Sequence, residues 1–168
     1  MDFDYSNRSF CYVHHNLSRS GIMCVSVDDF SKKWQREPPT LFPSVDSVSF
    51  MALDWVSGAW YLVDGAAGAM FVCSRDLAHC RLLQDSLAKL RGLAIDPTPP
   101  QQNDNQPHGF IFWSVWGGSP ARVVRTELWG GAAADLAASR LVYPTALTLD
   151  LTNKWLYWVD AYMDSVER

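Results

Sequence analysis

Residues 147–160 read LTLDLTNKWLYWVD: a short apolar run ends on an Asp, and an aromatic-rich run ends ten residues after it. Related runs occupy residues 1–14 and 52–64 with the same ten-residue interval. A further pair, at 93–96 and 112–115, has an interval of nineteen residues. Recurrence of one pattern along a chain is typical of proteins built from repeated structural units. The pattern therefore predicts the architecture before any single residue is interpreted.

The composition is that of a globular β-protein. The chain has 168 residues, 48% of them hydrophobic and 19% charged, which excludes a disordered tail. Eight Trp, six Tyr and eight Phe suit the half-buried surfaces of strands. A formal net charge of −4 argues against a nucleic-acid partner. No apolar run reaches the roughly 20 residues that a membrane helix needs, and no signal peptide is visible.

Short aromatic and β-branched runs bounded by Gly, Asn, Asp or Pro predict an all-β chain. In its best-defined part we expect four strands joined by short turns, at 50–54, 59–64, 69–74 and 80–84. The first Asp of the pattern recurs at Asp54, Asp96 and Asp150, so one unit has the roughly 40 to 50 residues of a four-stranded propeller blade. Within one domain, 1–168, we expect antiparallel blades at about 1–45, 46–89, 90–141 and 142–168, the last incomplete.

Two segments depart from the regular unit. The polar, Pro-rich residues 97–108 explain the long interval and are interpreted as a surface insertion, either a tolerated loop or a partner-binding loop. The alanine-rich residues 130–138 stand where an outer strand is expected, and their helix preference predicts an irregular or helical blade edge.

The cysteines and two sequons indicate an oxidising compartment. Cys11 with Cys24, and Cys73 with Cys80, each straddle a predicted hairpin, where cross-strand neighbours can meet disulfide geometry. Neither pair has the spacing of a zinc site; four buried thiols in a cytosolic protein remain the alternative. Asn7 and Asn16 begin Asn-x-Ser sequons in predicted turns, which makes both candidate glycosylation sites. Together these features favour an extracellular or lumenal domain.

The runs at 61–64 (YLVD), 112–115 (FWSV) and 157–160 (YWVD) resemble degenerate YWTD motifs of the LDL-receptor class B repeat. The resemblance covers nearly all of the chain, and it implies a six-bladed β-propeller of which this chain holds about three and a half blades. Both ends look cut, because strand-like sequence follows Met1 at once and Arg168 ends the chain within a repeat. We therefore expect a fragment, attached to a membrane only through a segment outside this sequence.

The resemblance also implies roles for the acidic residues. In this family the final Asp of the motif helps to tie a blade to its neighbour, a role that here only Asp64 and Asp160 can take, since His14 and Val115 replace it in the other two copies. Three more acids, Asp54, Asp96 and Asp150, are interpreted as structural acceptors for backbone N–H groups at strand ends. Calcium ligation is the alternative for these three, but they lie on different strands and form no loop cage. No cofactor or metal is predicted for this chain; calcium belongs to neighbouring modules of the parent protein.

No catalytic constellation is present, and binding is the better hypothesis. The sequence has no GxSxG, HExxH or Walker pattern. Cys73 beside Arg75 and His79 could form a reactive thiol, but pairing with Cys80 explains this cysteine better. Residues directly after the motif strands are expected on one propeller surface, the partner face, comprising His14, His15, Asp64, Trp116, Tyr162 and Asp164. Packing of Trp116 between blades is the competing interpretation.

The resemblance implies a non-enzymatic ectodomain of an endocytic lipoprotein-receptor-related protein, on the cell surface and in the endosome lumen. Lipoproteins and proteinase–inhibitor complexes are the implied protein ligands. Acid-triggered release is a second implied role, for which His14 and His15 are the candidates because histidine ordinarily titrates near endosomal pH. The alternative is that His14 and His15 are two turn residues without such a role. One alternative is a structural propeller of a matrix or signalling receptor without lipoprotein ligands. A propeller hydrolase, the third hypothesis, requires carboxylates lining a central channel.

Overall fold

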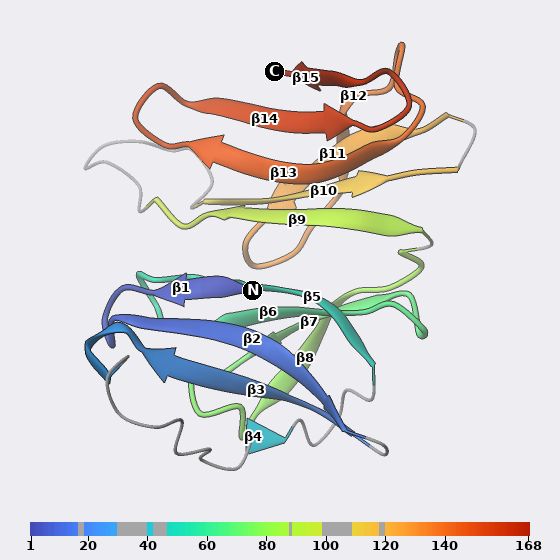
Figure 1. Ribbon diagram of the computed structural model, residues 1–168. Helices are drawn as coiled ribbons and strands as arrows, with labels where there is room; N and C mark the ends of the chain where they lie inside the picture. Colours follow the sequence, from blue (N-terminus) through green and yellow to red (C-terminus); the bar gives the residue numbers. More distant parts are fainter. Residues whose placement is uncertain (17–18, 30–39, 42–46, 88, 99–108, 118–119) are drawn as a thin grey trace, which may run out of the picture. The chain divides into compact units, whose positions relative to one another are not determined.

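The computed structural model describes residues 1–168 except 17–18, 30–39, 42–46, 88, 99–108 and 118–119 (Figure 1). The chain forms two compact units, Met1–Asp85 (unit 1) and Ser86–Arg168 (unit 2). Within the described residues the structure is all-β apart from a 3-10 turn, η1 (Val27–Asp29). This part of the chain contains no helix long and apolar enough to cross a membrane.

Unit 1 contains two antiparallel sheets whose four strands follow one another in chain order (Figure 1). The first comprises β1 (Asp2–Asp4), β2 (Ser9–Asn16), β3 (Arg19–Ser26) and β4 (Thr40–Leu41). The second comprises β5 (Val48–Leu53), β6 (Trp60–Asp64), β7 (Ala69–Cys73) and β8 (Cys80–Gln84). We call these sheets blades 1 and 2. β5 packs against both β1 and β2, so the two blades share one hydrophobic core.

Unit 2 repeats this arrangement. Blade 3 comprises β9 (Leu90–Asp96), β10 (Phe110–Val115), β11 (Arg122–Glu127) and β12 (Ala134–Ala137). Blade 4 has three strands, β13 (Pro144–Asp150), β14 (Trp155–Asp160) and β15 (Ser165–Glu167). β13 packs against β9 and β10, as β5 packs against β1 and β2 in unit 1.

Burial falls from the inner to the outer strands of a blade. All five residues of β6 are buried, whereas β8 at the outer edge is half-buried or exposed. A strand with both faces buried is nearly all apolar rather than alternating, which explains WYLVD in β6. The core of blade 2 therefore lies at its inner strands.

The outer strand of blade 3 corrects one prediction. Ala134–Ala137 form β12, paired with β11, and not a helix. Alanine's helix preference is weaker than the hydrogen bonds available at the edge of an existing strand. The expected irregularity is present as a register shift between Val123 and Val124. The predicted surface insertion at 97–108 lies outside the described residues beyond Thr98.

Candidate functional site

Both predicted disulfides are present, and all four cysteines are paired. Cys11 and Cys24 are register partners on β2 and β3, and Cys73 and Cys80 are register partners on β7 and β8. In each pair one cysteine, Cys11 or Cys73, is almost completely buried in the core that blades 1 and 2 share. The disulfides therefore reinforce the interior of unit 1 and form no reactive thiol.

The acids that end each first strand accept hydrogen bonds from the following turn. One Asp54 oxygen accepts the N–H groups of Val56 (2.8 Å) and Ser57 (3.1 Å). Asp150 accepts the N–H groups of Thr152 and Asn153, both at 3.0 Å. Asp96 accepts both the N–H and the hydroxyl of Thr98. Such carboxylates hold the tight turns at one end of the sheets and are occupied by the backbone.

Asp64 and Asp160 each form a carboxylate bridge within one blade. Asp160 is fully buried and accepts N–H groups from Val142 (2.8 Å) and Tyr143 (3.1 Å), which lead into β13. Its other oxygen accepts those of Tyr162 (3.0 Å) and Met163 (3.2 Å) in the next turn. Burial raises the pKa of Asp160, but these four donors outweigh it and leave the pKa below the usual 3.8.

Asp64 repeats the bridge in blade 2, with Ser47 on one side and Ala66 and Ala67 on the other. These bonds differ from the inter-blade role predicted for the two acids, because they join the segment leading into a blade to a turn of the same blade. Asp64 is only 6% exposed, so the structure also removes it from the predicted partner face.

Blade 3 replaces the missing acid with a base. Where blades 2 and 4 have Asp64 and Asp160, blade 3 has Val115, which offers no carboxylate. The Lys89 ammonium, just before β9, donates to the carbonyl of Gly117 at 2.7 Å. The backbone N–H of Trp116 also donates to the Lys89 carbonyl at 3.2 Å. In blade 3 the segment before the first strand is thus connected to the turn after the second strand by a cation, whereas blades 2 and 4 use an anion.

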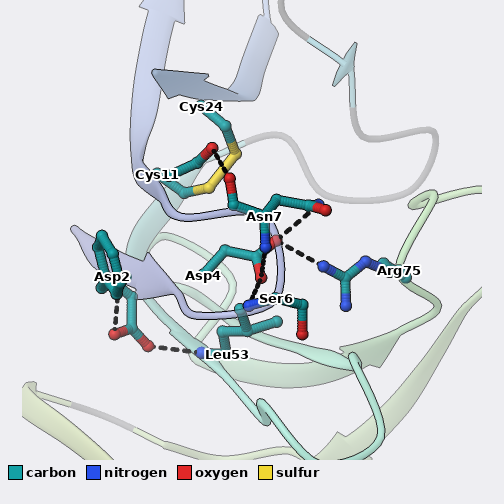
Figure 2. The surroundings of a disulfide bond; sticks show 10 residues. Asp2, Asp4, Ser6, Asn7, Cys11, Cys24, Leu53 and Arg75 are labelled. Carbon is teal, nitrogen blue, oxygen red and sulfur yellow. Dashed lines mark hydrogen bonds and ion pairs between the residues drawn. A yellow bond between two sulfur atoms is a disulfide. The ribbon is translucent and has the colours of Figure 1, made fainter. Parts of the chain in front are cut away.

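Bonds between blades come from other residues. In unit 1, Asp2 accepts the N–H of Leu53 at 2.6 Å, and the buried Asp4 pairs with Arg75 at 2.6 Å (Figure 2). The Asn7 side-chain amide donates to the same Asp4 oxygen at 3.0 Å. The candidate glycosylation site Asn7 therefore also has a structural contact. The other candidate, Asn16, ends β2, and its side chain lies outside the described part.

In unit 2, blades 3 and 4 approach each other closely. The Ser114 hydroxyl donates to the Thr145 carbonyl at 2.8 Å. A Cβ added to Gly92 would lie 2.1 Å from that carbonyl oxygen, so only glycine fits there. Lys154 also extends from blade 4 to Asp96 at 3.9 Å, a weak and exposed ion pair.

The predicted partner face is only partly recovered. Tyr162 is 70% exposed and Asp164 is exposed, both in the turn after β14. Trp116 is half-buried, so its burial does not decide between the partner face and packing between blades. The structure places His14 and His15 inside β2, paired with Gly21 and Ser20, rather than beyond a strand end. Their side chains lie outside the described part, so the pH-sensing role stays a prediction.

Two residues missed by the sequence reasoning complete a surface around Trp116. The Tyr143 ring lies 4.4 Å from the Trp116 ring, and the Arg91 guanidinium stacks 4.8 Å from the Trp116 centroid. The carbonyl of Tyr143 accepts the N–H of Ala161, the residue before Tyr162. We call Arg91, Trp116, Tyr143 and Tyr162 the aromatic surface. Arg91 and Tyr143 lie near the starts of first strands, a position that the sequence reasoning did not consider.

The chemistry of this surface suits recognition rather than catalysis. Exposed aromatic rings with a cation are typical anchors of protein interfaces. Among the described residues, no group of three His, Cys, Asp or Glu side chains could hold a metal ion. The indole N–H of Trp116 is buried and has no hydrogen-bond partner among the described residues.

Comparisons with known proteins agree with this architecture. No family model matches the chain. It is 29% identical over 115 residues to the vitellogenin receptor of Solenopsis invicta and 27% identical over 128 residues to vitellogenin receptor Yl of Drosophila melanogaster. These alignments cover 68% and 76% of the chain but only 6% of each receptor. The Homo sapiens low-density lipoprotein receptor-related protein 5-like protein is 27% identical over 118 residues, 70% of the chain and 43% of that protein.

Among solved structures, a chain of a nidogen/laminin complex is similar with a TM-score of 0.74. It is 23% identical and covers 95% of this chain and 55% of that one. The fold is that of a partial β-propeller of the YWTD type. The chain is thus similar to segments of two receptors and of a receptor-related protein, and its two disulfides are typical of an oxidising compartment.

Proposed function

We propose that this chain is a non-enzymatic part of the ectodomain of an endocytic receptor, and that it binds protein ligands through the aromatic surface of unit 2. The contiguous Arg91–Trp116–Tyr143 stack carries the proposal, and the exposed Tyr162 follows Ala161, whose N–H donates to the Tyr143 carbonyl. Rigid aromatic side chains contribute large contact areas at little entropic cost, and a stacked guanidinium adds a charge that selects acidic partners.

Lipoproteins and proteinase–inhibitor complexes are the proposed ligands. The name of one relative, a low-density lipoprotein receptor-related protein, supports the first of them, and the second rests on the family resemblance alone. A finer likeness connects the chain to the first propeller of LDL receptor-related protein type 1, the alpha-2-macroglobulin receptor. It rests on MDFDY at 1–5, CYVH at 11–14, FVC at 71–73, LDL at 149–151 and DAY at 160–162. The relatives reported above are other receptors, so this likeness depends on these residues alone.

Binding of two purified probes, low-density lipoprotein and a proteinase–inhibitor complex, tests the proposal. We expect Tyr162→Ala to weaken binding at least fivefold without changing the fold, because its side chain is mostly in solvent. Trp129→Ala is the matched control: this Trp is 61% exposed and lies beyond the other end of the strands of blade 3. Equal effects of the two variants, or binding of neither probe, would contradict the proposal.

Acid-triggered release is the second part of this proposal. Loss of either probe between pH 7 and about pH 5 should require His14 and His15, because histidine is the side chain that ordinarily titrates there. A His14→Gln/His15→Gln variant that still releases the probe would exclude them as the sensor.

A structural propeller in matrix or signalling assemblies is the second candidate. The observation that favours it is the similarity to a chain of the nidogen/laminin complex. A laminin fragment is therefore a third probe for the same binding assay. Its binding at the aromatic surface, without binding of lipoprotein, would favour this candidate.

A further inference from the structure

The chain contains two copies of the pattern Trp-x-x-Trp, at positions that are not equivalent in the repeat. They are WSVW at 113–116 and WLYW at 155–158. Trp-x-x-Trp is the acceptor sequence for tryptophan C-mannosylation, in which a lumenal transferase attaches a mannose to the indole of the first Trp. A short motif is only a hypothesis until its structural context supports it. The two copies differ sharply in that context.

Trp155 is accessible and Trp113 is not. Trp155 is the first residue of β14 and is 42% exposed, whereas Trp113 lies within β10 and is 2% exposed. A mannose carries several hydroxyls, and burying them without hydrogen-bond partners is strongly unfavourable. The folded protein therefore has room for the sugar on Trp155 but not on Trp113.

The contact between Arg168 and Trp155 is compatible with a modified indole. The Arg168 guanidinium lies 4.3 Å above the centre of the Trp155 ring and so covers one face. A sugar attached to Cδ1 projects from the edge of the ring, in its plane, and leaves the face free for stacking. Blade 3 has the same arrangement, with Arg125 4.6 Å above Phe110, the first residue of β10. Phe110 in blade 3 is the counterpart of Trp155 in blade 4, and it stays half-buried although blade 4 packs on blade 3. A residue at this position therefore keeps part of its surface in solvent even when the next blade is present.

We propose that Trp155 is a C-mannosylation site. The donor is a mannosyl phospholipid. The bond between C1 of mannose and its phosphate oxygen breaks, and the lipid phosphate leaves with the electron pair. C1 then bonds to indole Cδ1, and the Cδ1 proton passes to a base of the transferase, which restores aromaticity. The proposal rests on the proposed extracellular function, because the donor is used in the secretory lumen.

Peptide mass spectrometry of the full chain tests the site. The chain is expressed behind a secretion leader in animal cells that contain the transferase, and both secreted and cell-retained protein are digested. We expect one hexose on the Trp155 peptide that survives enzymes removing N- and O-linked sugars. The Trp113 peptide should carry none, which makes it an internal control of the same motif. Trp155→Phe should abolish the hexose.

The two proposals fail in distinguishable ways. Protein that acquires both disulfides but carries no hexose on Trp155 would overturn the C-mannosylation site alone. A hexose on Trp113 instead would overturn the structural argument for choosing between the motifs. Protein in the lumen whose cysteines remain free thiols would contradict the proposed extracellular function, whatever the state of Trp155.

Discussion

Units 1 and 2 join their pairs of blades by different chemistry. Unit 1 has two disulfides next to the shared core and an ion pair between the buried Asp4 and Arg75. Unit 2 has no cysteine and relies on the close approach of Gly92 to the Thr145 carbonyl, with a hydrogen bond from Ser114. One pair of blades is therefore stabilised mainly by cross-links and a buried charge, and the other mainly by close packing and a hydrogen bond, so the two units should respond differently to the same perturbation.

The largest difference is expected from removal of the disulfides. Loop entropy predicts that Cys11→Ala/Cys24→Ala destabilises unit 1 by about 3 kcal/mol, and Cys73→Ala/Cys80→Ala, with its shorter loop, by about 2.4 kcal/mol. Their sequence separations are 13 and 7 residues. Hydrogen exchange of both units reports the effect. Equal loss of protection in unit 2 would show that the two units unfold together and end the comparison.

In unit 2 the corresponding weak point is Gly92. Gly92→Ala should destabilise unit 2 by about 2 kcal/mol, since the new methyl group must displace a backbone carbonyl. Urea unfolding measures the change. Ser114→Ala is the control, because it removes a bond to the same carbonyl without adding atoms, and its effect should be smaller. A neutral Gly92→Ala would mean that the blades are packed less closely than described.

The carboxylate bridges sharpen the comparison, since each unit has one. Asp160→Asn should cost about 1.5 kcal/mol, because a buried anionic acceptor of four N–H groups is replaced by an amide. Asp64→Asn, with three such donors, should cost less. Denaturant midpoints of the two variants measure the difference, and the reverse order would contradict it.

The pH dependence of Asp160 follows from its pKa, which lies below 3.8 in the folded protein. The unfolded chain then takes up the proton first, so the stabilisation is complete above about pH 5 and is lost as the pH falls through the folded pKa. Urea unfolding of the wild type and Asp160→Asn should therefore differ by the same amount at pH 7 and at about pH 5. If the difference in unfolding free energy between the wild type and Asp160→Asn became smaller between pH 7 and about pH 5, the lowered pKa of Asp160 would be contradicted.

The smallest effect is expected at the reversed bridge of blade 3. Lys89→Met should cost about 0.5 kcal/mol, because the bond from Lys89 to Gly117 is exposed. Adding Val115→Asp to that variant should recover stability by restoring the acid that blades 2 and 4 use. Chemical denaturation of the single and double variants measures both steps. Further loss in the double variant would show that the turn of blade 3 cannot accept a carboxylate.

Much of the fold could be predicted because its signals are local. The strands expected at 69–74 and 80–84 correspond to β7 and β8, and register places Cys73 opposite Cys80. At 130–138 only the helical alternative was wrong, because pairing with β11 overrode alanine's helix preference, whereas the expected irregularity is present as a register shift. The same logic failed at His14 and His15, since β2 continues to Asn16, beyond the length that the repeat suggested.

The site was less predictable because it depends on which blade packs on which. No local pattern connects Arg75 with Asp4, or Arg91 with Trp116, since each pair is brought together only when sheets or strands stack. Likewise, nothing local reveals that Asp64 is buried by backbone donors while Tyr162 is in solvent. Burial in the tertiary structure decides whether an acidic or aromatic side chain is accessible to a binding partner.

The sequence by itself determined the repeat, the order of the strands and the pairing of the cysteines, because each depends on residues within one hairpin or one meander. The tertiary structure decided which carboxylates are occupied by the backbone, how neighbouring blades are joined, and which of two identical Trp motifs is accessible. Those outcomes depend on side chains tens of residues apart meeting across packed sheets. Their physical reason is the burial and close approach that only the stacked blades create.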